Sequence, residues 1–146
     1  MTLPKFNENG DLPAERHAAT LDEVLTRFGK STAQRAGVAQ RLTRIHQLAM
    51  ATGHVRRFVV FGSFVTSKPH PNDVDIFIVM DDDFDFSQTQ GETRLLFEHG
   101  TAHSHFGASV FWLRQLAAYN GEDAAIADWR IKRDGTERGI VEIISD

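Results

Sequence analysis

Residues 73–80 constrain the fold of this chain more than any other segment. Polar and apolar residues alternate at its start, and five apolar residues, Ile76–Met80, then follow without interruption. A short run of this kind is typical of a β-strand that is buried on both faces. Because such a strand must be covered from two sides, the sequence predicts a sheet that is packed by helices.

Helices and further strands are predicted on both sides of this segment. Thr20 and Glu23 form a capping-box pattern ahead of a short helix, and apolar residues at steps of three and four predict a second helix of about five turns that ends near Gly53. The remaining expectations are strands over 55–61 and 108–113, helices over 87–98 and 115–127, and a hairpin formed by 129–132 and 139–144. The predicted fold class is α+β (α/β-like), with a central mixed sheet packed by N-terminal helices and a C-terminal β-hairpin.

The chain is expected to form one domain. Residues 1–19 are predicted to be an extended lead-in, and residues 20–146 are enough for one hydrophobic core and too few for two. The absence of cysteine excludes a disulfide framework, a zinc ribbon and a thiol nucleophile. No apolar run approaches the roughly 20 residues of a membrane span, and residues 1–10 are polar, so a cytoplasmic protein without a membrane partner is expected.

Charge is spread unevenly along the chain. The net charge of −4 argues against non-specific binding of nucleic acid. Residues 27–57 contain seven Lys or Arg residues and no acid, whereas residues 73–98 contain eight acids and Arg94 as their one base. The two stretches are either solvated faces or parts of one site, in which carboxylates bind a cation and basic side chains bind phosphates.

The candidate site combines Gly62 and Ser63 with Asp73 and Asp75. A strand that ends at Gly62 lets the backbone approach a ligand closely, and turn amides with the Ser63 hydroxyl can cradle a phosphate. Asp73 and Asp75 are two residues apart at the start of a strand, so both carboxylates point to one side and repel each other unless a cation lies between them. Each motif alone is common in turns or at solvated strand ends, but together they predict a site for Mg²⁺, or Mn²⁺, and phosphates.

The segment from Gly62 to Asp75 resembles the nucleotidyltransferase superfamily that includes DNA polymerase β, and more narrowly its minimal bacterial branch. Residues 62–69 and 72–75 carry this resemblance. Two C-terminal segments, 133–135 and 138–142, are similar to those of an uncharacterised group of small bacterial members. The likeness covers roughly residues 20–146.

The resemblance implies a nucleotidyltransferase fold and the transfer of a nucleoside monophosphate from an NTP to a hydroxyl of a protein, an RNA or a small molecule, with pyrophosphate leaving. It implies that Gly62 and Ser63 hold the β and γ phosphates, and that Asp73 and Asp75 are the catalytic metal ligands. Lys68 in the following loop is a further candidate phosphate ligand, although an exposed loop lysine is commonly ordinary surface.

Possible partners also follow from the resemblance. Many small relatives belong to toxin–antitoxin or phage-defence operons, so a partner protein from the same operon is expected. Nucleic acid is expected only as a specific acceptor, and a homo-oligomer is left open.

The sequence departs from the family pattern at a third carboxylate, which relatives place on the next central strand. The register predicts Ser109, or else Ala108, at that position, and neither is an anionic ligand or a base at neutral pH. Another acid could reach the site in its place, with Asp85 and Glu98 as the candidates.

A histidine could also replace the third carboxylate. His103 or His105 could serve as the base, and His105 shares a side with Ser109 if the intervening residues are extended. If neither an acid nor a histidine reaches the site, the protein binds Mg-NTP and transfers slowly or not at all. It would then be a nucleotide-binding or antitoxin-like subunit of a toxin–antitoxin or defence system.

Overall fold

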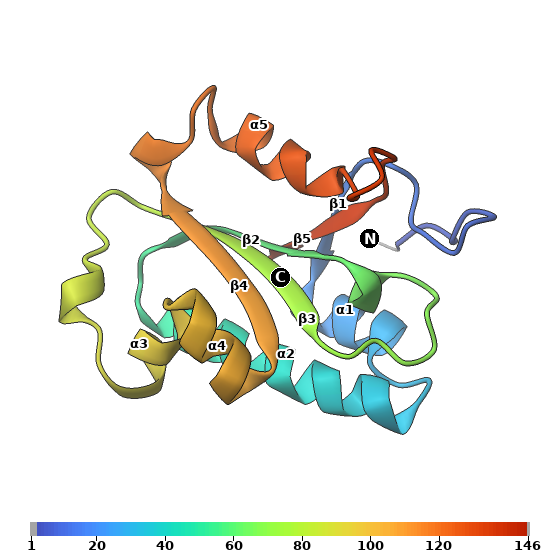
Figure 1. The fold of residues 1–146 in the computed structure, drawn as a ribbon, viewed down its shortest axis with the longest axis horizontal. Helices are drawn as coiled ribbons and strands as arrows, with labels where there is room; N and C mark the ends of the chain where they lie inside the picture. Colours follow the sequence, from blue (N-terminus) through green and yellow to red (C-terminus); the bar gives the residue numbers. More distant parts are fainter. Residues whose placement is uncertain (1–2, 146) are drawn as a thin grey trace.

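The computed structural model describes residues 3–145, and its centre is a five-stranded sheet (Figure 1). The strand order is β1-β5-β2-β3-β4. β1 and β5 are parallel, as are β3 and β4, whereas β2 is antiparallel to both β3 and β5. The prediction of a mixed sheet in an α+β fold is therefore confirmed. The strands are β1 (Arg16–Thr20), β2 (Val55–Phe61), β3 (Val74–Met80), β4 (Ala108–Arg114) and β5 (Ile140–Ile144).

The helices form where the sequence offers capping groups and apolar stripes. At the start of α1 the Thr20 and Glu23 side chains each accept a hydrogen bond from the other's backbone amide, which confirms the capping box. No helix within residues 3–145 is long and apolar enough to cross a membrane. The α-helices are α1 (Leu21–Phe28), α2 (Ala33–Ala51), α3 (Gly91–Leu96), α4 (His99–Phe106) and α5 (Glu122–Ala127), and the 3-10 turns are η1 (Ser63–Val65), η2 (Phe86–Gln88), η3 (Gln115–Ala117) and η4 (Asp128–Arg130).

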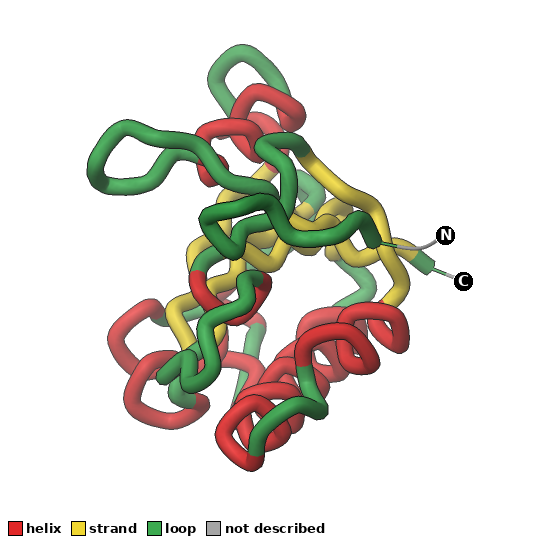
Figure 2. The backbone as a smooth tube through the Cα atoms, turned by 90° about the vertical axis from the view of Figure 1, so that its right-hand side faces the viewer, coloured by secondary structure: helices red, strands yellow, loops and turns green. Residues whose placement is uncertain are grey.

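The sheet separates two apolar cores. On one face, Ile76 and Ile78 of β3 pack with α1, α2, α3 and α4, and on the other face Phe77 and Val79 pack against α5 and η4. Figure 2 shows the strands lying between these two helical groups. β3 is thus buried from both sides, as its apolar run predicts.

The N-terminal segment is packed onto the rest of the fold. Leu3 and Leu12 are buried, and β1 at the end of the segment pairs with β5. The Arg27 guanidinium donates to the Leu3 and Pro4 carbonyls, which fixes the segment against α1. The extended lead-in therefore contributes both core residues and one strand of the sheet.

The predicted C-terminal β-hairpin does not form as expected. Trp129 lies in η4, and a single bridge joins Ile131 to Glu137. Residues 140–144 instead form β5, which pairs with β1 on one side and with β2 on the other. The physical reason is that a strand with two neighbours satisfies more backbone groups and buries more apolar surface than the arm of an isolated hairpin.

The expectation that His105 lies on an extended strand is also wrong. Residues 99–106 form α4, which ends at Gly107 with a φ of 64°, in the left-handed region that favours glycine. β4 begins only at Ala108. The helix predicted over 87–98 is divided into η2 and α3.

Candidate functional site

The sheet register places the predicted site residues at one end of neighbouring strands. Phe61, the last residue of β2, lies opposite Asp75 of β3, and Asp75 lies opposite Ser109 of β4. Because side chains alternate along a strand, Asp73, Asp75 and Ser109 belong to the face that α5 and η4 cover. Gly62 follows Phe61 directly, so both predicted motifs meet at this end of the sheet.

Gly62 and Asp75 are in direct contact. Gly62 is buried and has φ 79° and ψ −164°, a conformation that is essentially restricted to glycine. A Cβ atom at this position would clash with Asp75 Oδ2. Any side chain at residue 62 would therefore displace the Asp75 carboxylate, so glycine is needed here for the close approach of the turn to Asp75, a contact that was not predicted from the sequence.

The two carboxylates repel each other. Burial and then the charge of Asp73 raise the pKa of Asp75 to about 6, whereas Arg138, Ser109 and Arg133 act in the opposite direction. The Ser109 hydroxyl lies 3.5 Å from Asp73 Oδ2, at the limit of a hydrogen bond. A cation between the carboxylates would remove this electrostatic cost.

The donor set fits a divalent cation that is shared with a ligand. Mg²⁺ is commonly bound by one or two carboxylates together with substrate phosphates, and this needs no complete cage of protein ligands. Asp73 and Asp75 supply two such carboxylates side by side. Within residues 3–145, no group of three or more His, Asp or Glu side chains is placed to hold a metal.

Arg35 fixes the segment that follows Ser63, a role that was not predicted from the sequence. Its buried guanidinium donates hydrogen bonds to four main-chain carbonyls, those of Phe28, Phe64, Thr66 and Lys68. The Thr66 hydroxyl adds a hydrogen bond to the Ser63 carbonyl at 2.7 Å. A sequence signal was present, since Arg35 stands three residues before Val38 and continues the apolar stripe of α2.

Lys68 lies on the loop between η1 and β3. Its carbonyl accepts a hydrogen bond from Arg35 Nε at 3.1 Å, and the residue is exposed. The Lys68 ammonium forms no salt bridge within the part of the chain that the structure describes. Its role as a phosphate ligand stays a prediction.

The residue opposite Asp75 on β4, where the resemblance predicted a replacement for the third carboxylate, is Ser109. Ala108, the other candidate from the register, is buried opposite Val74 and belongs to the core of the α2 face. Glu98 forms a salt bridge with Arg94 at 3.5 Å and precedes α4. The side chain with which Glu98 pairs therefore lies on α3 and not beside Asp73 and Asp75.

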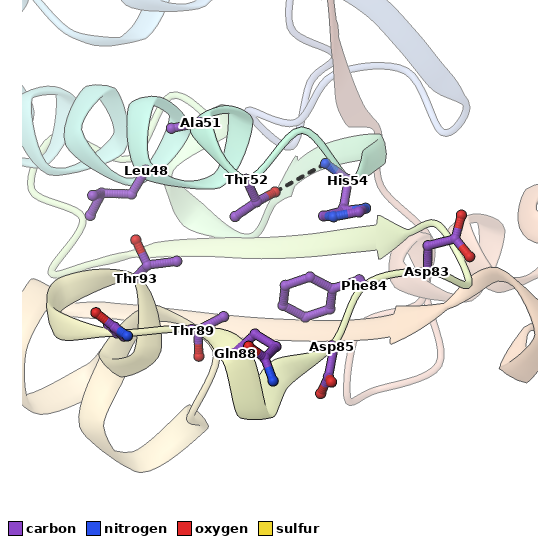
Figure 3. Close-up of a pocket in the computed structure, with 11 residues that line it drawn as sticks. Leu48, Ala51, Thr52, His54, Asp83, Phe84, Asp85, Gln88, Thr89 and Thr93 are labelled. Atoms are coloured by element: carbon purple, nitrogen blue, oxygen red, sulfur yellow. Dashed lines mark hydrogen bonds between the residues drawn. The ribbon is translucent and has the colours of Figure 1, made fainter.

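Asp85 is at the wrong end of the sheet to replace the third carboxylate. It follows the far end of β3, roughly 20 Å along the strand from the start at which Asp73 lies. There it borders an open cavity of about 390 Å³ between the end of α2 and the 83–93 segment (Figure 3). Its carboxylate accepts hydrogen bonds from the amide and hydroxyl of Ser87.

The histidine candidates lie on α4, whose buried side chains Ala102 and Phe106 belong to the core on the opposite face from Asp75. His105 Nε2 is 3.0 Å from a carboxylate oxygen of Glu92. His103 is exposed on the same helix. The structure therefore does not bring either imidazole together with Asp73 and Asp75.

Comparison with protein-family models places the chain in a family. Residues 4–144 match the model described as a family of unknown function, DUF6932. The chain belongs to this family. No curated protein and no solved structure gives a significant match. The description of DUF6932 carries no activity, so its function has to be inferred from the site.

The C-terminal strand of this DUF6932 protein carries a buried ion pair. Glu142 of β5 is 7% exposed and accepts hydrogen bonds from Arg57 at 2.7 and 2.9 Å and from Arg16 at 2.9 Å. The Glu142 carboxylate raises the pKa of Arg57, so this pair stays charged. Glu142 therefore joins β5 to β1 and β2 and is structural.

Proposed function

We propose that this DUF6932 protein is a Mg²⁺-dependent nucleotidyltransferase, which transfers a nucleoside monophosphate from an NTP to a hydroxyl of a protein, an RNA or a small molecule. The observation that carries the proposal is the contact between Gly62 and the Asp75 carboxylate, with Asp73 beside it. A backbone turn that ligands can approach closely suits phosphates, and a repelling carboxylate pair suits a divalent cation. The two features meet at one end of the sheet.

Each residue has a defined task in this proposal. Asp73 and Asp75 would hold Mg²⁺, which when bound would offset the negative charge of the phosphates. Gly62 and the Ser63 hydroxyl would position the β and γ phosphates. Arg35 keeps the segment after Ser63 in place, so the phosphate site is preorganised before the nucleotide binds.

Asp73→Asn should abolish label transfer. The variant keeps the size of the side chain and removes one charged ligand, so we expect transfer from labelled NTP to fall by at least about 100-fold. The assay incubates the protein with each labelled NTP and Mg²⁺ or Mn²⁺, in the presence of cell lysate. The matched control is Asp83→Asn, because Asp83 is an exposed aspartate beyond the far end of β3. Equal transfer by wild type and Asp73→Asn would contradict the proposal.

Ser109 favours a second candidate function, Mg-NTP binding without transfer, as in a nucleotide-binding or antitoxin-like subunit. Its hydroxyl occupies the position at which relatives are expected to carry the carboxylate that activates the acceptor. In this case the wild type binds NTP only with Mg²⁺, and no label is transferred. Ser109→Asp should then produce transfer, measured in the same assay. Transfer by the wild type would exclude this second function.

A further inference from the structure

The C-terminal loop that carries Arg133 and Arg138 leads into β5 at the end of the sheet at which the carboxylates lie. β5 is antiparallel to β2, and Val60 lies opposite Val141, so the row across the sheet that contains Phe61 and Asp75 continues to Ile140. Arg138 precedes Ile140 by two residues and is therefore beyond the same end of the sheet as Asp73. The two strand spacings between β5 and β3 amount to roughly 10 Å, which a long arginine side chain and a phosphate chain can span together.

This loop is held close to the Gly62 turn. Lys132 Nζ is 3.0 Å from Asp11, which is 5% exposed, and Asp11 also forms a β-bridge with Thr66, three residues after Ser63. The Arg138 amide donates to the Arg130 carbonyl at 2.9 Å. Asp11 therefore links the loop to the segment that follows the proposed phosphate turn.

Arg133 and Arg138 also differ in their pairing from seven other basic residues of the chain. Within residues 3–145 neither forms a salt bridge, whereas a second set of basic residues does: Arg16, Arg44, Arg56, Arg57, Arg94, Arg130 and Lys132. Both act electrostatically on Asp75 and favour its charged form. Their charge thus acts on the candidate site, and no salt bridge among the described residues neutralises it.

We propose that Arg133 and Arg138 form an anion subsite that binds the terminal phosphates of a nucleotide held at Gly62 and Asp75. This inference rests on the proposed function and specifies the ligand further, as one with a polyphosphate chain. A nucleoside triphosphate adds about four negative charges to those of Asp73 and Asp75, which is more than one Mg²⁺ offsets, so two guanidinium groups would neutralise part of the remainder. Guanidinium also suits phosphate because it can donate two parallel hydrogen bonds.

The test compares ligands with and without the polyphosphate chain. Binding of inorganic tripolyphosphate, of each NTP and of each NMP is measured by calorimetry in the presence of Mg²⁺. We expect Arg138→Gln and Arg133→Gln each to weaken binding of tripolyphosphate and of the accepted NTP by about 10- to 100-fold, and to leave NMP binding within about twofold. The matched control is Arg94→Gln, which removes a surface arginine on α3.

The outcomes separate this inference from the proposed function. Wild-type protein that binds neither tripolyphosphate nor any NTP contradicts the proposed function itself. If the wild type binds NTP, Asp73→Asn does not, and both arginine variants match Arg94→Gln, only the anion subsite is overturned. Arg138→Lys, which keeps the charge, should restore part of the tripolyphosphate binding. Thermal unfolding of every variant checks that a loss of binding does not arise from unfolding.

Discussion

Asp75→Asn should make the metal-free protein more stable at pH 8 and at the same time abolish its Mg²⁺-dependent nucleotide binding. The side chain keeps its shape beside Gly62 and loses its charge. In most folded proteins, a substitution that removes a buried side-chain group lowers the stability. Here the charge is unfavourable in the absence of a cation, because burial and the neighbouring Asp73 both oppose it.

The direction of this effect depends on pH. The pKa of Asp75 is about 6 in the folded protein against 3.8 for an ordinary aspartate, so the folded state binds the proton more tightly than the unfolded state does. Wild-type stability is therefore lost as the pH rises from about 4 to about 6, by up to about 3 kcal/mol and by about 1–2 kcal/mol once solvent screening of the half-buried group is included. Asp75→Asn avoids this loss. Metal binding has the opposite dependence and weakens below pH 6, as Asp75 becomes protonated.

Urea unfolding at pH 4 and pH 8 measures the stability difference. We expect the wild type and Asp75→Asn to approach each other at pH 4, and the variant to be more stable at pH 8. Mg²⁺ with NTP should raise the stability of the wild type and leave Asp75→Asn unchanged, since only a state that binds ligand is stabilised by it. Asp83→Asn serves as the exposed control. An Asp75→Asn variant that is less stable than the wild type at pH 8 would show that the carboxylate makes favourable contacts in the apo protein.

Local patterns were sufficient to predict the centre of the fold. The apolar run Ile76–Met80 predicts a strand buried on both faces, and the structure has β3 between β2 and β4. The position of Ser109 opposite Asp75 agrees with the register that the resemblance implies. The buried strand itself depends on the residue period within one segment, which the sequence reports directly.

Features that depend on distant parts of the chain were not predictable in this way. The pairing of β5 with β1 joins residues more than 120 positions apart, and a local turn signal at 134–135 favoured a hairpin instead. α4 carries three histidines and few apolar residues, so its sequence lacks a strong helical period. The proximity of Arg138 to the carboxylates likewise arises only once β5 is placed beside β2.

Arg35→Met should lower the free energy of unfolding by about 3–5 kcal/mol. Arg35 is 3% exposed, and burial lowers the pKa of its guanidinium, yet the hydrogen bonds to four carbonyls compensate for the lost hydration. Methionine fills similar volume and donates no hydrogen bond, so these buried carbonyls lose their partner. Arg35→Lys keeps the charge but has fewer hydrogen-bond donors. We therefore expect its loss of stability to be smaller than that of Arg35→Met. Urea unfolding measures both variants.

Arg41→Met on the same helix is the matched control. Arg41 is exposed and its guanidinium donates one long hydrogen bond, to the Asn72 carbonyl at 3.3 Å, so its loss should change stability by less than about 0.5 kcal/mol. Hydrogen exchange should also show faster exchange of the amides of residues 63–68 in Arg35→Met, under conditions in which the protein remains folded. An Arg35→Met variant within about 1 kcal/mol of the wild type would mean that the segment after Ser63 is held by its own turn and by Thr66. If the segment is instead held by Arg35, the residue couples the stability of the α2 core to the geometry of the proposed phosphate turn, because one guanidinium contacts both.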